Sequence, residues 1–235
     1  MNWLRRLLRR KPVLDAEQTQ ALAAYHARPA IADNSPLKTL RCVVVDVETT
    51  GLNPFTDRLI SIGAVKVVSG KVRLTGAFEI VLCQQQPSTR ANILIHGIDG
   101  TTQLTGQEPA AALLKFLDYA GKAPLIGFHA GFDRMMIDRA CMDILGITTS
   151  NTWLDLAYLA PALFNEPGKT MPEQGLDNWL RRFGIENDMR HNALADAVAT
   201  AQLLQVILAQ AIVSDANILA DLSRIEQDQR WLRQL

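Results

Sequence analysis

The sequence is short of cysteine and lacks an excess of charge of either sign. Its 235 residues contain three cysteines, Cys42, Cys83 and Cys141, which are far apart and form no CxxC pair. This spacing argues against a disulfide framework and a structural zinc site, and it favours a reducing, intracellular setting. The 24 Lys and Arg residues balance 24 Asp and Glu residues. A protein that coats long nucleic acids is usually strongly basic, so any contact with nucleic acid is expected to be local.

The amino terminus also lacks a long uninterrupted apolar run. Arginines interrupt the segment 1–11, so it cannot act as a signal peptide or a membrane span. It is typical of a basic amphipathic helix that contacts nucleic acid, an anionic membrane surface or a protein partner, or that packs on the domain. We favour the packed helix, and we expect a soluble, cytoplasmic protein without stable membrane insertion. The basic side consists of Arg5, Arg6, Arg9, Arg10 and Lys11, and the apolar side of Trp3, Leu4, Leu7 and Leu8.

The apolar content of 48% is enough for one full core with flanking helices. We expect a basic helical extension over 1–38, which includes a second, Ala-rich helix over 15–27. The stretch from Pro29 to Pro36 contains helix breakers and is typical of a linker. A principal domain should follow over 39–213, and a C-terminal helix over 214–235 should pack on it.

The elements expected after residue 40 define an α/β fold. Three strands come first, and the turn at Ser69 and Gly70 between the last two indicates an antiparallel meander. After Pro109 helices and strands alternate, which indicates parallel strands with helical crossovers. We therefore expect a mixed five-stranded sheet with helices on both faces. The expected strands are 41–47, 59–68, 71–82, 125–128 and 152–156, and the expected helices are 110–119, 132–145, 172–183, 193–212 and 215–235.

Two acids lie near the end of the first strand, among valines. Side chains two apart on a strand point to the same face, so Asp46 and Glu48 project together. Such a pair is costly unless a bound cation offsets its desolvation and repulsion. An edge strand with one wet face is the weaker alternative, because the strand runs into a turn, Thr49-Thr50-Gly51, that suits close approach of a ligand.

Asp133, His191 and Asp196 are the other candidates. Asp133 opens a helix after the strand 125–128, a position that alone indicates a helix cap but that in an open α/β sheet lies where ligands bind. His191 and Asp196 are five apart, so they share one site only if His191 precedes the helix that carries Asp196. A loop histidine beside metal-bound water is suited to general-base work, although a lone one would simply be solvated. Four carboxylates and this histidine can serve a two-metal nuclease.

These residues resemble the motifs of the DEDDh 3′–5′ exonuclease superfamily, which contains the epsilon proofreading subunit of bacterial replicative DNA polymerase. The similarity covers 40–208, with motifs at 46–52, at 132–133 and at 191–197. It implies an RNase H-like fold and two Mg²⁺ or Mn²⁺ ions held by Asp46, Glu48, Asp133 and Asp196, with His191 as the base. It also implies a pocket for the terminal nucleotide, lined by Thr49, Gly51, Leu52, His96 and Phe132.

One departure from the family concerns His129, which stands where asparagine is common. It bears on substrate detail and not on metal binding, because every acidic ligand is present. The implied activity is release of nucleoside 5′-monophosphates from single-stranded or frayed DNA 3′ ends, alone or with a polymerase or other partner. A 3′–5′ exoribonuclease is the alternative, and contact with a 2′-hydroxyl would decide between them. A non-catalytic nucleic-acid or polymerase-binding module is disfavoured, since all four acids and the histidine are kept.

Overall fold

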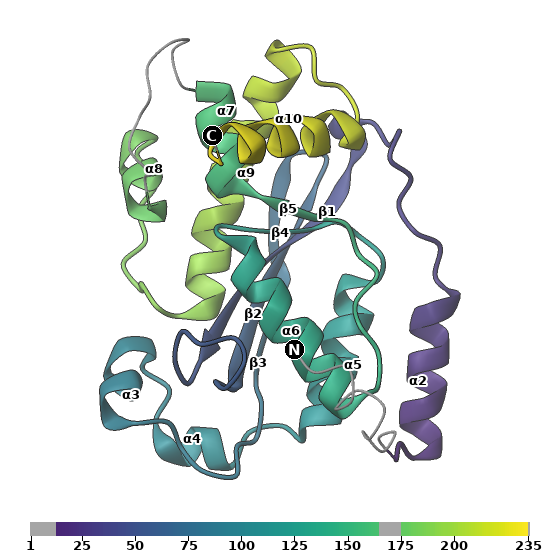
Figure 1. Cartoon of the computed structure of the whole chain (residues 1–235), viewed down its shortest axis with the longest axis vertical. Helices are drawn as coiled ribbons and strands as arrows, with labels where there is room; N and C mark the ends of the chain where they lie inside the picture. The colour runs from purple at the N-terminus through teal and green to yellow at the C-terminus, as the bar shows by residue number, and fades with distance from the viewer. Residues whose placement is uncertain (1–12, 165–174, 235) are drawn as a thin grey trace.

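The computed structural model describes residues 13–164 and 175–234, and a five-stranded sheet forms its centre (Figure 1). The strands are β1 (Arg41–Thr49), β2 (Leu59–Val68), β3 (Lys71–Val81), β4 (Leu125–Gly127) and β5 (Trp153–Asp155). Their order is β3-β2-β1-β4-β5. The first three pair antiparallel, whereas β4 and β5 are parallel to β1. The predicted mixed five-stranded α/β sheet is confirmed, and β1 is its central strand.

Helices cover both faces of the sheet, and alternate residues of β1 point into two separate cores. Val43 and Val45 pack with the helices of one face, and Cys42 and Val44 pack with those of the other. The first face carries α2 (Ala16–Ala27), α5 (Pro109–Ala120) and α6 (Ala130–Ile144); the second carries α7 (Leu156–Phe164), α8 (Leu176–Arg182), α9 (Ala193–Val213) and α10 (Leu219–Leu232). By the same alternation Asp46 continues the row of Cys42 and Val44, on the face that α9 covers.

The start of α9 lies directly against β2. A Cβ atom on Gly63 would stand 2.2 Å from backbone atoms of Ala193 and Leu194, so only glycine permits this approach. Gly63 pairs with Asp46 across the β1–β2 ladder. The contact therefore brings the first turn of α9 next to the acidic end of β1. By length and composition α9 could cross a membrane, but 56% of its most apolar window is buried inside the protein, as expected of a core helix.

The stretch predicted to be a linker is not free. Main-chain N–H groups of Leu219 and Ala220 donate to carbonyls of Ser35 and Asp33, and Leu37 is 1% exposed in the core. Before this stretch, Tyr25 of α2 is buried, and its hydroxyl donates to Asn151 at 2.9 Å. The linker prediction is wrong, because the carbonyls of Asp33 and Ser35 are hydrogen-bonded to the C-terminal helix region and Leu37 is buried in the core. The domain boundary near residue 38 stays a prediction, and the basic segment 1–11 lies outside the described residues.

Several helices escaped the sequence-based prediction. They are α3 (Arg90–His96), α4 (Gly100–Leu104) and α7. The first two are too short to show a helical period, and α7 contains Pro161. The strand predicted to end at residue 156 ends at Asp155, whose carboxylate accepts the N–H of Ala157 at 3.0 Å and so starts α7. Of the helix predicted over 172–183, the structure describes α8.

Candidate active site

Three carboxylates meet where β1 ends and α9 begins. Asp46, Glu48 and Asp196 each place an oxygen within 4.8 Å of the others, which is close enough for one ion to touch all three. Asp46 and Glu48 are partly buried, and Asp196 is 4% exposed. The alternation of side chains along β1 places Asp46 and Glu48 on one face, and the close contact of α9 with Gly63 places Asp196 beside them. Oxygen ligands in such number suit a hard divalent cation.

Asp133 approaches this group from α6. It lies in the first turn of that helix, 5% exposed, and outside the tight set of three. Burial raises the pKa of its carboxyl to about 7, although the main-chain N–H groups of Asp133 and Val47 oppose the shift. Its charge in turn raises the pKa of both Asp46 and Glu48. The structure therefore brings three of the predicted acids into one tight cluster and places the fourth, Asp133, where its charge acts on Asp46 and Glu48.

The pKa shifts show what this group costs in the absence of a cation. Burial raises the pKa of Asp46 well above its ordinary value, and the charges of Asp133, Asp196 and Glu48 add to it. The pKa of Glu48 rises to about 8, first through burial and then through Asp196 and Asp133. A bound cation would relieve both causes, since it replaces lost hydration and offsets repulsion. The donor set thus fits a divalent metal.

Asp196 is surrounded by donors from the loop before α9. The guanidinium of Arg190 and the amide of Asn187 both contact its Oδ1, the latter at 2.5 Å, and the N–H of His191 donates to its Oδ2 at 3.0 Å. Arg190 also pairs with Asp177 of α8, with 2.6 Å between Nε and Oδ1. Burial lowers the pKa of Arg190, but its bond to Asp196 and the neighbouring acids outweigh that effect and raise it.

Sequence reasoning missed Arg190 and Asn187. Neither belongs to the motifs at 46–52, 132–133 and 191–197, and an arginine next to a histidine carries no periodic or spacing signal. Only the path of the loop, which folds back over the first turn of α9, brings both side chains onto Asp196. Arg190 consequently supplies positive charge at the point where the four acids accumulate negative charge.

His191 lies where the sequence places it. It precedes α9 by two residues, is exposed, and has φ 63°, a left-handed backbone that is uncommon outside glycine. Its neighbour Asn192 caps the helix by accepting the N–H of Ala195 at 2.9 Å. The prediction that a loop histidine precedes a helix carrying Asp196 on its first turn is therefore correct in geometry, while its part in proton transfer stays a prediction.

The residues predicted to line a nucleotide pocket come from the end of β1, the turn after it, α3 and α6. Leu52 is 88% exposed, and Phe132, which precedes Asp133 in the chain, is partly buried. Thr49 is buried, and its hydroxyl donates to the carbonyl of Gly51 at 2.7 Å. The side-chain amide of Asn92, in α3, donates to the carbonyl of Thr49 at 3.0 Å and joins α3 to the end of β1.

His96 is engaged inside the protein. It is 4% exposed; its Nδ1 accepts the N–H of Ile98 at 2.9 Å, and its Nε2 lies 2.9 Å from Oδ1 of Asn92. Because Nδ1 accepts, Nε2 carries the proton and donates. Leu94 and Ile95 are the large apolar residues of this segment that are exposed. The imidazole thus shapes the loop, and its predicted role in substrate binding would act through that shape.

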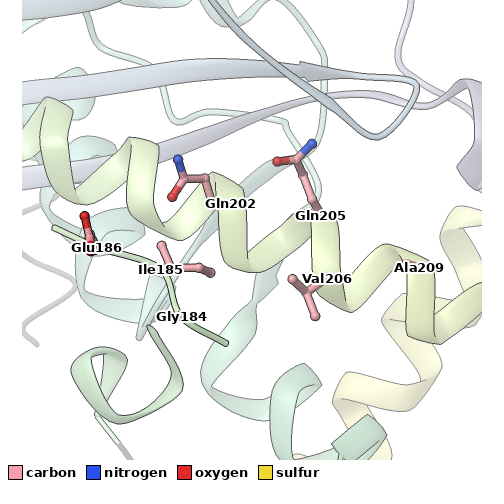
Figure 2. A pocket seen from close by; sticks show the side chains of 7 residues that line it. All are labelled: Gly184, Ile185, Glu186, Gln202, Gln205, Val206 and Ala209. Atoms are coloured by element: carbon pink, nitrogen blue, oxygen red, sulfur yellow. The ribbon is translucent and has the colours of Figure 1, made fainter. Parts of the chain in front are cut away.

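One groove in the described part of the chain is lined by none of the four acids. Its volume is about 790 Å³, and it runs between the outer side of α9 and the segment after α8, as Figure 2 shows. Its lining consists of small, apolar and amide side chains with one acid: Gly184, Ile185, Glu186, Gln202, Gln205, Val206 and Ala209. This composition brings no nucleophile or ligand cluster, so we assign the chemistry to the acids.

A mixed sheet whose central strand ends in clustered carboxylates is typical of metal-dependent nucleases of the RNase H-like fold. The family model RNase_T, described as an exonuclease, matches residues 43–204. The chain belongs to this exonuclease family. The predicted resemblance to the DEDDh superfamily is thereby confirmed, and the matched range contains every acid of the site as well as His191.

Two curated relatives carry polymerase names. The chain is 29% identical over 197 residues to a DNA polymerase III subunit epsilon-like protein of Rhodobacter capsulatus, a match covering 81% of this chain and 27% of that protein. It is 33% identical over 161 residues to a PolC-type DNA polymerase III of Caldanaerobacter subterraneus, covering 68% and 11%. The chain therefore corresponds to only about a quarter or less of the length of these relatives.

Solved structures show the same fold. Exonuclease I of E. coli in complex with a dT13 oligonucleotide matches with a TM-score of 0.61 and 20% identity, over 74% of this chain and 42% of that chain. Exonuclease X in complex with 5′ overhanging duplex DNA matches with a TM-score of 0.60 and 19% identity, over 79% and 99%. The fold class predicted from the sequence agrees with both.

Proposed function

We propose that this protein is a metal-dependent 3′–5′ exonuclease that releases nucleoside 5′-monophosphates from single-stranded or frayed DNA. One observation carries the proposal: three carboxylate oxygens lie within 4.8 Å of one another at the end of the central strand, in a chain of the exonuclease family. Asp133 adds a fourth acid whose charge acts on two of them. In this proposal Asp46, Glu48, Asp133 and Asp196 hold two divalent ions, Mg²⁺ or Mn²⁺.

The chemistry divides between the ions and the side chains. When bound, the ions supply Lewis-acid activation of a water and stabilisation of the leaving oxygen. His191, exposed in the loop before α9, takes the proton of the attacking water and passes it to solvent. Leu52 and Phe132 offer apolar surface to the terminal bases. Thr49 and Gly51 shape the backbone beside the acids, so that the last phosphodiester is directed at them.

The choice of DNA rests on the relatives and neighbours. The two exonuclease structures contain a dT13 oligonucleotide and an overhanging duplex DNA, and the curated relatives bear DNA polymerase names. An association with a polymerase or another partner, and a cytoplasmic location, belong to the same proposal. The balanced charge of the chain agrees with a site that binds an end and not a long stretch of nucleic acid.

Degradation of labelled oligonucleotides tests the proposal. DNA and RNA strands labelled at the 3′ or the 5′ end are incubated with the protein in Mg²⁺, Mn²⁺ or EDTA. We expect loss of the 3′ label as a mononucleotide, shortening ladders from the 5′ label, preference for DNA, and no reaction in EDTA. Asp46→Asn should be inactive. Asp188→Asn, which alters an exposed acid of the same loop as His191, is the matched control and should act like the unaltered protein. Metal-independent or endonucleolytic cleavage would contradict the proposal.

A further inference from the structure

Asp155 ends the edge strand β5, and its buried side chain has no place in the chemistry above. It is 3% exposed and pairs in register with Gly127, the last residue of β4. Its Oδ1 accepts the main-chain N–H of His129 at 2.9 Å and that of Ala157 at 3.0 Å. One carboxylate oxygen therefore holds both chain segments that leave the ends of β4 and β5.

The bond to His129 fixes the start of α6. His129 has φ 59° and ψ 38°, a left-handed conformation uncommon for a residue with a Cβ, and α6 begins at the next residue without a side-chain cap of its own. Asp133 lies in the first turn of this helix. Because the first turn of α6 follows directly on the left-handed backbone at His129, a change in the His129 backbone would move the carboxylate of Asp133 relative to the other acids.

The C-terminal helix holds Asp155 in turn. Glu226 of α10 is 6% exposed, and its Oε2 accepts the main-chain N–H of Asp155 at 3.0 Å. Because β5 is an edge strand, no further strand is available to accept this N–H. Arg230, one turn later, donates through Nε to Glu226 at 2.9 Å and lies 3.4 Å from Oδ2 of Asp155. Figure 1 shows α10 beside β5, above the start of α6.

Asp155 and Glu226 are buried close together, so their carboxylates depend on hydrogen bonds and a positive charge for stabilisation. Burial raises the pKa of Asp155 and of Glu226, and main-chain N–H groups and the Arg230 guanidinium oppose the shift in both. The guanidinium is in addition stacked on the ring of Tyr158, with 4.1 Å from Cζ to the ring centroid. Such fixed geometry is what a carboxylate needs to hold a neighbouring segment in one place.

We propose that Asp155 is a positioning residue of the exonuclease site, which fixes the start of α6 and thereby Asp133, and that α10 holds it through Glu226 and Arg230. The inference rests on the proposed function, because Asp133 is assigned there as a metal ligand. Outer groups that orient metal ligands typically change metal affinity by about 10- to 100-fold when removed. The C-terminal helix would then help to position the site, although it contributes none of the four acids.

Binding of Mn²⁺, followed by the EPR signal of the free ion, tests this without reference to activity. We expect Asp155→Ala to weaken Mn²⁺ binding about tenfold or more. Asp155→Asn, which keeps an oxygen for both main-chain N–H groups, should stay within about threefold of the unaltered protein. Asn151→Ala is the matched control: it removes buried hydrogen bonds to Tyr25, Gly121 and Ala123 near the opposite end of β5 and should lower the Tm without changing Mn²⁺ affinity.

Three outcomes would overturn the inference. First, Asp155→Ala could bind Mn²⁺ as tightly as the unaltered protein. Second, Asp155→Asn could lose as much Mn²⁺ affinity as Asp155→Ala, which would indicate that the charge matters and not the position. Third, Asn151→Ala could lose as much Mn²⁺ affinity as Asp155→Ala, which would indicate general loosening of the fold. If Asp155→Ala does not fold, Arg230→Met decides, with weakened Mn²⁺ binding expected and unchanged binding contradicting the inference. Unaltered protein that binds Mn²⁺ but hydrolyses no 3′ end would refute the proposed function alone.

Discussion

Replacing Glu48 by glutamine should make the metal-free protein more stable at alkaline pH. The pKa of Glu48 in the folded protein is about 8, against an ordinary value of 4.5, because the carboxyl is buried beside Asp196 and Asp133. An acid whose pKa is raised by folding favours the unfolded state once that state ionises. Its cost is therefore absent below about pH 4.5, grows as the pH rises, and is complete above about pH 8.

The size of the effect follows from these two pKa values. Their gap corresponds to about 5 kcal/mol at the upper limit. Partial exposure of the side chain and relaxation of its neighbours reduce this figure, and glutamine keeps some cost of burial. We expect Glu48→Gln to gain about 2 kcal/mol at pH 8.5 in EDTA, which raises the Tm by roughly 4–8 °C for a chain of this length. At pH 4.5 the two proteins should melt together.

Thermal unfolding at both pH values, with EDTA or Mg²⁺, measures this. Mg²⁺ should reverse the order at pH 8.5, because it binds only the native site and Glu48→Gln has lost a ligand. Asp188→Asn serves as the control for removal of an exposed acid in the same protein and should leave the Tm unchanged. A variant less stable than the unaltered protein at pH 8.5 in EDTA, or equally stabilised at pH 4.5, would refute the account of the acidic cluster.

Three further predictions follow from the site and the packing. His191→Ala should slow the chemical step about 100-fold or more with little change in binding of a single-stranded end, and His129→Ala should be much milder; equal single-turnover rates for the two variants would contradict the assignment of the base. Arg190→Met should lower the Mg²⁺ concentration for half-maximal stabilisation by a few fold, because it removes a positive charge bound to Asp196; a higher concentration in the melting assay would count against this. Deleting 1–12 should leave hydrolysis of short oligonucleotides intact. Deleting 1–38 should leave that hydrolysis nearly intact as well but should lower the Tm, since it removes the buried Tyr25 and Leu37. An unchanged Tm would show that α2 adds nothing to the stability of the domain.

The sequence by itself determined the longer elements and the four acids. A strand of valines carrying Asp46 and Glu48 two apart must present both on one face, and no knowledge of the rest of the fold is needed to see it. The strand over 59–68 and the helix starting at 193 were located for the same reason, because a regular apolar period specifies its own element. The order of the motifs then sufficed to indicate the family.

The tertiary structure decided which residues distant in the sequence contact one another at the site. Arg190 meets Asp196 because a loop folds back, Gly63 admits α9 because two distant segments approach, and Asp155 reaches His129 because β4 and β5 end side by side. None of these contacts has a local signature. The apolar period that locates a helix or strand is set by residues close in the chain, whereas a site depends on the path that brings distant residues together. One sequence pattern is compatible with many such paths until the whole chain has packed.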